Sequence, residues 1–93
     1  MVLFTWDTEK NEKLKSERSI SFEKAVFHIE NGCLLDIIKH PNQKNYAGQK
    51  IFIVNIDNYA HLVPFIEKEN WIILKTIIPS RKMTKKYLKK GEE

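Results

Sequence analysis

The pattern of hydrophobic and polar residues predicts a short strand, two helices, four strands and a final helix. The strongest apolar run, residues 71–78, is rich in β-branched side chains and is followed by Pro79. Such a run is typical of a strand that is buried on both faces of its sheet. We therefore expect residues 71–78 to form the central strand, and we expect Pro79 to end its pairing because proline has no N–H to donate.

Two segments near the N-terminus predict helices. Residues 21–31 place their apolar side chains on one stripe, and Ser21 can cap the first turn. Residues 8–18 follow Asp7, another capping residue, and predict a weaker helix that depends on docking for its stability. The apolar stripe of the stronger helix consists of Phe22, Ala25, Val26 and Ile29.

The remaining apolar or alternating segments predict further strands. A tight turn at residues 57–59 joins two of them into a hairpin, and Pro64 predicts a bulge or an unpaired position in the second. The connection at residues 40–49 is longer than most loops. With a basic helix at residues 80–90, this order predicts an α+β fold with a mainly antiparallel meander sheet. The further strands are predicted at residues 2–6, 33–39, 50–56 and 60–67.

The composition agrees with one small folded domain. A chain of 93 residues has room for a single core, so we treat residues 1–93 as one domain. The formal net charge is +4 and the sequence pI is about 9.2, which favours an anionic partner. The excess is local, because residues 80–93 contain six Lys or Arg side chains and only two carboxylates.

Features that the sequence lacks exclude several classes of protein. The single cysteine, Cys33, rules out an internal disulfide and a cysteine metal cluster, and it fits a reducing, cytoplasmic location. No apolar run approaches the roughly 18–20 residues of a membrane span. The chain also has no glycine-rich phosphate loop. We therefore expect no metal, no cofactor and no membrane association.

Three short segments resemble the BrnT family of type II toxins. They are FTWDTEKN at residues 4–11, ISFEKA at residues 20–25 and IIPSRKMTKKY at residues 77–87. The family pattern runs W-D-x-x-K, then V-S-F-E-x-A at the same offset, and ends I-S-A-R-x-A-T. The resemblance falls on Trp6, Asp7, Lys10, Phe22, Glu23, Ser80, Arg81 and Thr84.

The resemblance implies a RelE-like fold and a ribonuclease that cleaves mRNA and arrests translation. It also implies a cognate antitoxin from an adjacent gene, and contact with operator DNA only through that antitoxin. One part of the family pattern is absent, because the usual K-H-G is Glu17-Arg18-Ser19 in this chain. Either Arg18 and His40 take over its role, or the chain is a catalytically inactive homologue.

We predict a metal-independent endoribonuclease with three candidate catalytic residues. Arg81 would stabilise the pentacoordinate phosphorane, since a guanidinium contacts two phosphate oxygens at once. His40, which directly follows a predicted strand, would transfer the proton. Lys10 would assist if its helix packs beside the sheet. The residues expected to track the RNA are Lys82, Lys85, Lys86 and Tyr87.

The sequence leaves alternatives open at several points. Arg81 has a structural interpretation, which is an ion pair with Glu67 or Asp36. His40 has the alternative of an ordinary exposed histidine, and His61 alternates onto the apolar face of its strand and is first interpreted as structural. For the whole chain, the alternatives are an inactive toxin homologue and a nucleic-acid-binding domain without chemistry.

Overall fold

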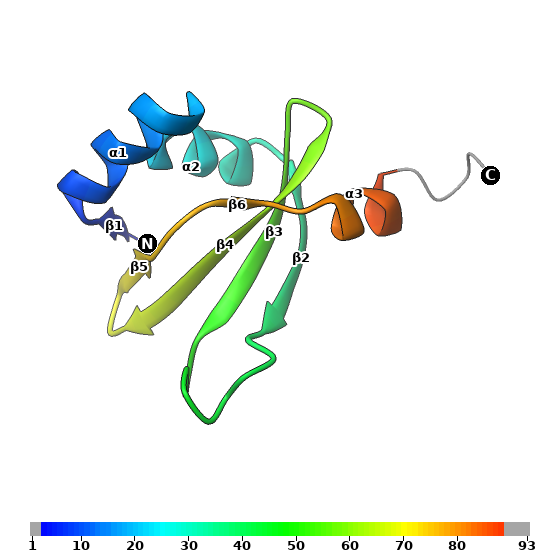
Figure 1. Cartoon of the computed structure of the whole chain (residues 1–93). Helices are drawn as coiled ribbons and strands as arrows, with labels where there is room; N and C mark the ends of the chain where they lie inside the picture. The colour runs from blue at the N-terminus through cyan, green and yellow to red at the C-terminus, as the bar shows by residue number, and fades with distance from the viewer. Residues whose placement is uncertain (1–2, 89–93) are drawn as a thin grey trace.

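The structure is a computed structural model that describes residues 3–88, and within that range its frame is a six-stranded mixed sheet (Figure 1). The strands are β1 (Leu3–Trp6), β2 (Leu34–Lys39), β3 (Lys50–Ile56), β4 (Tyr59–Lys68), β5 (Trp71–Leu74) and β6 (Ile78–Pro79). Strands β2 to β5 follow one another as antiparallel neighbours, while β1 pairs in parallel with β5 and β6 pairs with β4. The predicted α+β fold with a mainly antiparallel sheet is confirmed.

The described part of the chain contains three helices, and each begins at the capping residue expected from the sequence. They are α1 (Thr8–Arg18), α2 (Phe22–Glu30) and α3 (Arg81–Tyr87). The caps Asp7, Ser21 and Ser80 accept hydrogen bonds from the N–H groups of Glu9, Lys24 and Met83 at 2.8, 3.1 and 3.1 Å. The predicted extension of the last helix to residues 89–90 lies outside the described residues. No helix among residues 3–88 has the length and apolar character needed to cross a membrane.

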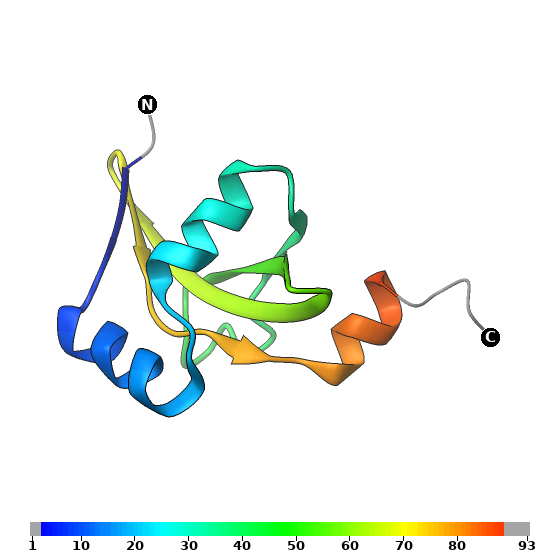
Figure 2. The ribbon, with the colours of Figure 1, turned by 90° about the horizontal axis from the view of Figure 1, so that it is seen from above.

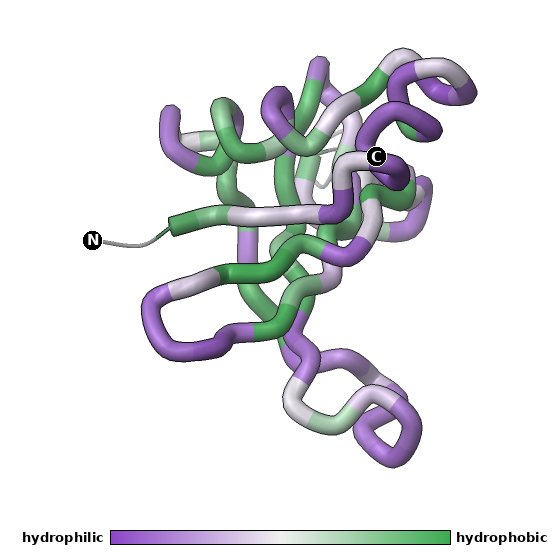
Figure 3. Tube along the Cα trace, turned by 90° about the vertical axis from the view of Figure 1, so that its left-hand side faces the viewer, coloured by the Kyte–Doolittle hydropathy of each residue, from purple (hydrophilic) through white to green (hydrophobic). Residues whose placement is uncertain are grey.

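The core lies between the sheet and the first two helices. Helices α1 and α2 lie on the same side of the sheet, and α3 lies away from β1 (Figures 1 and 2). The Trp6 ring stacks on Phe22 with 5.6 Å between centroids and so joins β1 to α2. The connection between β2 and β3 projects from the sheet and is mostly hydrophilic (Figure 3). The core cluster consists of Leu14, Ile20, Phe22, Ala25, Phe52, Val54, Ile56, Val63, Phe65, Leu74 and Ile77, and the further buried apolar residues include Ile51, Ile53 and Ala60.

Residues 71–78 do not form the single buried strand predicted for them. Strand β5 ends at Leu74, and pairing resumes only in the two-residue strand β6. Trp71 is 44% exposed, and the most buried strand is β3. The physical reason is that Leu74 and Ile77 both belong to the core cluster. A continuous strand alternates with period two and would put these two residues on opposite faces, so the chain leaves the sheet between them.

Pro79 and Pro64, which lie near the point where the chain leaves the sheet, do not interrupt strand pairing in the way that the sequence predicted. Pro79 does not end the pairing but lies in β6 opposite His61, where a short edge strand tolerates the missing N–H. Pro64 pairs in register with Ile51, so the predicted bulge is absent there. The predicted unpaired position is found only on the other edge of β4, where pairing passes from β5 to β6.

Asn11 is the polar side chain that joins α1 to the start of α2. It is 3% exposed, its Oδ1 accepts a hydrogen bond from the Phe22 N–H at 2.8 Å, and its Nδ2 donates to Glu23 Oε1 at 2.8 Å. The second hydrogen bond favours the ionised carboxyl and is the main cause of the lowered pKa of Glu23. One buried amide therefore satisfies two groups in the first turn of α2 and ties the two helices together.

Replacement of Asn11 by alanine should lower the free energy of unfolding by about 1–3 kcal/mol, because it leaves the buried Phe22 N–H without its acceptor. The matched control is Asn45→Ala in the exposed connection between β2 and β3, which should change stability little. Urea denaturation followed by tryptophan fluorescence measures both variants. Equal stability of the two variants would contradict this role for Asn11.

Candidate functional site

Helix α3 presents the predicted cationic residues to solvent. The alternative interpretation of Arg81, an ion pair with Glu67 or Asp36, is not observed. Glu67 pairs with Lys50 at 3.0 Å, and Asp36 accepts a hydrogen bond from Tyr87 at 2.6 Å. No ion pair within residues 3–88 involves Arg81, so its charge remains available to a ligand. The exposed cations of α3 are Arg81, Lys82, Lys85 and Lys86.

The three candidate catalytic residues are not brought together. His40 follows β2, where its N–H donates to the Gln49 carbonyl and its ring stacks on Tyr46 with 4.2 Å between centroids. Arg81 lies at the opposite end of β3 and β4, which is a separation of about 20 Å along the strands. Lys10 is in the first turn of α1, which begins beside β1, whereas α3 lies away from β1 (Figures 1 and 2). A single centre made of Arg81, His40 and Lys10 is therefore not assembled.

Tyr87 anchors the end of α3 to the sheet. Its hydroxyl donates to Asp36 Oδ2 at 2.6 Å, which joins α3 to β2. This hydrogen bond is the main cause of the lowered pKa of Asp36, with a second contribution from the Ile37 N–H, and also of the raised pKa of Tyr87. Lys86 Nζ lies 5.4 Å from the centre of the Tyr87 ring. The side chain predicted to contact RNA is therefore already engaged within the protein.

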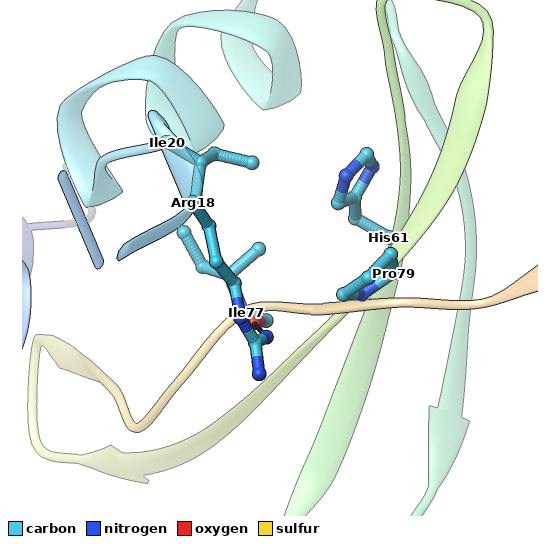
Figure 4. Close-up of a pocket in the computed structure, with 5 residues that line it drawn as sticks. All are labelled: Arg18, Ile20, His61, Ile77 and Pro79. Carbon is cyan, nitrogen blue, oxygen red and sulfur yellow. Dashed lines mark hydrogen bonds between the residues drawn. The ribbon is translucent and has the colours of Figure 1, made fainter. Parts of the chain in front are cut away.

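A cavity of about 410 Å³ opens between the end of α1, β4 and β6 (Figure 4). Ser19 ends α1 with a left-handed φ of 54°, and the chain then turns so that Ile20 lines the cavity. The Arg18 guanidinium donates to the Ile77 carbonyl at 3.1 Å. A guanidinium carries five N–H donors, so this bond leaves others for a ligand. The lining residues are Arg18, Ile20, His61, Ile77 and Pro79.

His61 reaches this cavity from β4, across from Arg18 (Figure 4). Its Nδ1 lies 2.9 Å from the Tyr59 carbonyl oxygen. Because a carbonyl only accepts, we assign the hydrogen to Nδ1 and the lone pair to Nε2 in the neutral form. Burial lowers the pKa of His61, and this effect outweighs the Tyr59 hydrogen bond and the charge of Asp57, which raise it. At neutral pH the imidazole is therefore uncharged and able to accept a proton at Nε2.

A second cavity, of about 320 Å³, lies at the base of α3. Thr84 holds the helix on the sheet there, because its Oγ1 accepts a hydrogen bond from the Ala60 N–H and donates to the Ser80 carbonyl, both at 2.8 Å. The Ser80 N–H in turn donates to the Ala60 carbonyl at 2.9 Å. These bonds give the cavity a rigid base. Its lining residues are Tyr59, Arg81, Thr84 and Lys85.

The two cavities are neighbours because aromatic residues from each are in contact. The ring centroids of Tyr59 and His61 lie 5.8 Å apart in an edge-to-face arrangement. The only two arginines of the sequence, Arg18 and Arg81, therefore flank one surface. In the part of the chain that the structure describes, no three His, Cys, Asp or Glu side chains gather as metal ligands would. We call this surface the two-cavity strip and define it by Arg18, His61, Tyr59, Arg81 and Lys85.

The sequence assigned His61 a structural role and Arg18 only a conditional one. Strand alternation correctly placed His61 on the face of β4 that contributes to the core. The path of residues 75–79 leaves its ring beside an open cavity, and that path was not predicted. The sequence signal was a titratable side chain at a core-facing strand position. The second mark of a functional site, an environment that perturbs its pKa, is visible only in the structure.

Most residues that carry the family resemblance have structural roles. Trp6 stacks on Phe22, and Thr84 fixes α3 to β4. Glu23 accepts the Asn11 amide. The capping residues of this set are Asp7 and Ser80. Most of the resemblance therefore falls on residues of the scaffold, and two of its members, Arg81 and Thr84, also line the second cavity.

The stability that Tyr87 contributes should depend on pH at both extremes. Asp36 has a lowered pKa in the folded protein. The stabilisation from its hydrogen bond should therefore be complete above the pKa of an unfolded Asp, about 3.9, and should be lost as the pH falls through the folded pKa. Tyr87 has a raised pKa in the folded protein. The stabilisation from its hydroxyl should therefore be complete below the pKa of an unfolded tyrosine, about 10, and should be lost as the pH rises through the folded pKa.

The difference in melting temperature between wild type and Tyr87→Phe should therefore be largest near neutral pH and shrink in acid and in alkali. Tyr46→Phe is the matched control, because the Tyr46 ring stacks on His40 and phenylalanine keeps that contact. A Tyr87→Phe difference that stays constant from pH 3 to pH 7 would show that Asp36 does not sense this hydroxyl.

Comparison with known proteins identified no relative of this chain. No family model, no curated protein and no solved structure matches the chain. The likeness to the BrnT family therefore rests on the three sequence segments alone.

Proposed function

We propose that this chain is the toxin of a type II toxin–antitoxin pair, with a RelE-like fold, and that it acts as a metal-independent endoribonuclease on mRNA. The observation that carries the proposal is the two-cavity strip, in which His61 shares one cavity with Arg18 and its ring contacts Tyr59, which shares the neighbouring cavity with Arg81. Cleavage of RNA without a metal needs a proton acceptor near the 2′-hydroxyl and positive charge near the phosphate. The strip contains both kinds of group.

His61 replaces His40 as the proton-transfer group in this proposal. Its Nε2 takes the proton from the 2′-hydroxyl, whose oxygen then bonds to the adjacent phosphorus. The bond from phosphorus to the 5′ oxygen breaks, a 2′,3′-cyclic phosphate forms, and the leaving 5′ oxygen takes a proton from water. His61 then returns its proton to solvent. The Tyr59 carbonyl supports this step because it holds Nδ1–H and keeps Nε2 as the acceptor.

Arg81 keeps the role expected from the sequence, which is to stabilise the phosphorane. It follows Ser80, which is held to Ala60 by a backbone hydrogen bond of 2.9 Å, so its backbone is well placed. Arg18 contacts a neighbouring phosphate from the other side of His61. Lys10 receives no part in the reaction, because it lines neither cavity although its helix packs on the sheet. The cations that track the RNA backbone are Lys82, Lys85 and Lys86.

The partners in this proposal are RNA, a cognate antitoxin and, through the antitoxin, operator DNA. Masking of the two-cavity strip by the antitoxin is a direct way to silence the enzyme, since both guanidinium groups lie on one surface. A second candidate function is a toxin homologue that binds its antitoxin without chemistry. The observation that favours it is the hydrogen bond of Arg18 to the Ile77 carbonyl, which gives the residue at the altered K-H-G position a structural role.

Replacement of His61 by glutamine should lower the rate of RNA cleavage by about a hundredfold or more, because glutamine cannot accept the proton. His40→Gln is the matched control and should leave the rate near that of wild type, since His40 lies at the other end of the sheet. The assay uses single-stranded RNA in the presence of a chelator, and thermal melting checks that both variants are folded.

The pH profile of wild type gives a second measure of the same assignment. The rate should rise with pH through an inflection below the ordinary histidine value of about 6.5, since burial lowers the pKa of His61. Loss of cleavage in His40→Gln with full cleavage in His61→Gln would return the role to His40. Absence of cleavage in the wild-type protein, with antitoxin binding intact, would support the second candidate function.

Arg81→Lys should lose nearly as much cleavage as Arg81→Ala, about a hundredfold, because an ammonium cannot contact two phosphate oxygens in the planar geometry of a guanidinium. Arg81 is exposed and has no ion pair within the described residues, so both variants should melt like wild type. Full cleavage by a folded Arg81→Ala protein would remove Arg81 from the reaction.

A further inference from the structure

Tyr59 is presented at a well-defined point of the molecule. The turn before it contains Asp57 and Asn58 with φ values of 57° and 67°, as in the tight hairpins that match the twist of their strands. Tyr59 then pairs with Ile56 as the first residue of β4. Its ring is held edge-to-face by His61, and the residue as a whole is 36% exposed. The ring therefore offers a fixed aromatic surface to solvent.

The other two tyrosines are differently placed. The Tyr46 ring is stacked on His40 with 4.2 Å between centroids, at the far end of the sheet. The Tyr87 hydroxyl is held by Asp36 at 2.6 Å. Tyr59 is thus the tyrosine that combines an exposed ring with a place in a cavity lined by cations.

The charges around Tyr59 favour an anion. Arg81 and Lys85 line the same cavity and are four residues apart on α3, so their side chains lie on one face of the helix. Asp57 is the acidic residue nearest to Tyr59 in the sequence, and it is paired with Lys24 at 2.7 Å. Within residues 3–88, neither Arg81 nor Lys85 takes part in an ion pair.

We infer that the cavity of Tyr59, Arg81 and Lys85 is a nucleotide subsite for single-stranded RNA. One unstacked base lies against the Tyr59 ring, and Arg81 and Lys85 contact the phosphates on either side of its nucleotide. The cavity volume of about 320 Å³ is at the lower end of ligand sites, which suits one base and no larger group. Stacking accepts every base, so the subsite selects for an unpaired strand and not for a sequence.

The subsite rests on the proposed function and deepens it, because it places the substrate in the strip. The Tyr59 ring touches the His61 ring, so a base stacked on Tyr59 belongs to a nucleotide next to the phosphate that is cleaved. A base inside a duplex is already stacked on both faces and is not free to occupy this position. The enzyme should therefore act on single-stranded segments.

The test is a binding measurement with a short single-stranded 2′-O-methyl RNA that carries a fluorescent label. This probe lacks the 2′-hydroxyl nucleophile and cannot be cleaved by the proposed reaction. Tyr59→Leu should weaken its binding by about 5- to 150-fold, which is the usual effect of losing one stacked base. Tyr59→Phe should bind like wild type because it keeps the ring. Tyr46→Leu is the matched control at an exposed tyrosine outside the strip, and it should also bind like wild type.

The salt dependence of RNA affinity distinguishes the contribution of the Tyr59 ring from that of the cationic side chains. Lys85→Ala should reduce the slope of log affinity against log salt by about 0.7, the value for one phosphate contact on a single strand. Tyr59→Leu should leave that slope unchanged. A duplex of the same sequence should bind with no dependence on Tyr59. Equal binding of the single strand by Tyr59→Leu and wild type would overturn the inference, and so would an equal loss for single strand and duplex.

A measurement on the wild-type protein covers the case in which Tyr59→Leu does not fold. Probes in which every position is abasic leave no base to stack in any register, and they should bind more weakly than the intact strand by at least a similar factor. Equal binding of the abasic and intact strands would overturn the subsite. None of these probes can be cleaved, so binding is measured separately from the cleavage of unmodified RNA. Base stacking on Tyr59 without cleavage of unmodified RNA would support the subsite and refute the nuclease. Cleavage without any effect of Tyr59 would do the reverse.

Discussion

The burial of Ile77 is the constraint on which the rest of the structure depends. Ile77 has no exposed surface and packs in the same core as Leu74, although a continuous strand would turn these two residues to opposite faces. The chain therefore leaves β5 and returns as β6 beside the beginning of β4. This return brings the Ile77 carbonyl to Arg18 and Pro79 to His61, so a packing requirement of the core creates the first cavity.

The passage of the chain from β5 to β6 also determines where the cationic helix α3 begins. Ser80 is bonded to Ala60 immediately after β6, Thr84 adds a buried hydrogen bond to the same residue of β4, and Tyr87 reaches Asp36 of β2. Both ends of α3 are thus attached to the sheet. A site built on a rigid element loses less conformational freedom when a ligand binds, which favours affinity for the same set of contacts.

Tyr59 connects the two halves of the candidate site. Its carbonyl oxygen lies 2.9 Å from Nδ1 of His61 and so determines which imidazole nitrogen is free to accept a proton. Its ring lines the second cavity together with Arg81. In the proposed function, one residue at the end of a hairpin thus orients the proton acceptor and also positions the substrate beside it. Most residues of the family-like segments, by contrast, cap helices or pack in the core and keep this geometry in place.

The sequence by itself determined the local structure. The helix caps, the apolar stripe of α2, the hairpin before Tyr59 and the cationic character of α3 all depend on residues that are close together in the chain. Tertiary structure alone decided the path of residues 75–79, the separation of His40 from Arg81, and the cavities in which Arg18 meets His61 and Arg81 meets Tyr59. The physical reason is that periodicity indicates which face of a strand a residue occupies, but the partner strand is chosen by packing of the whole core.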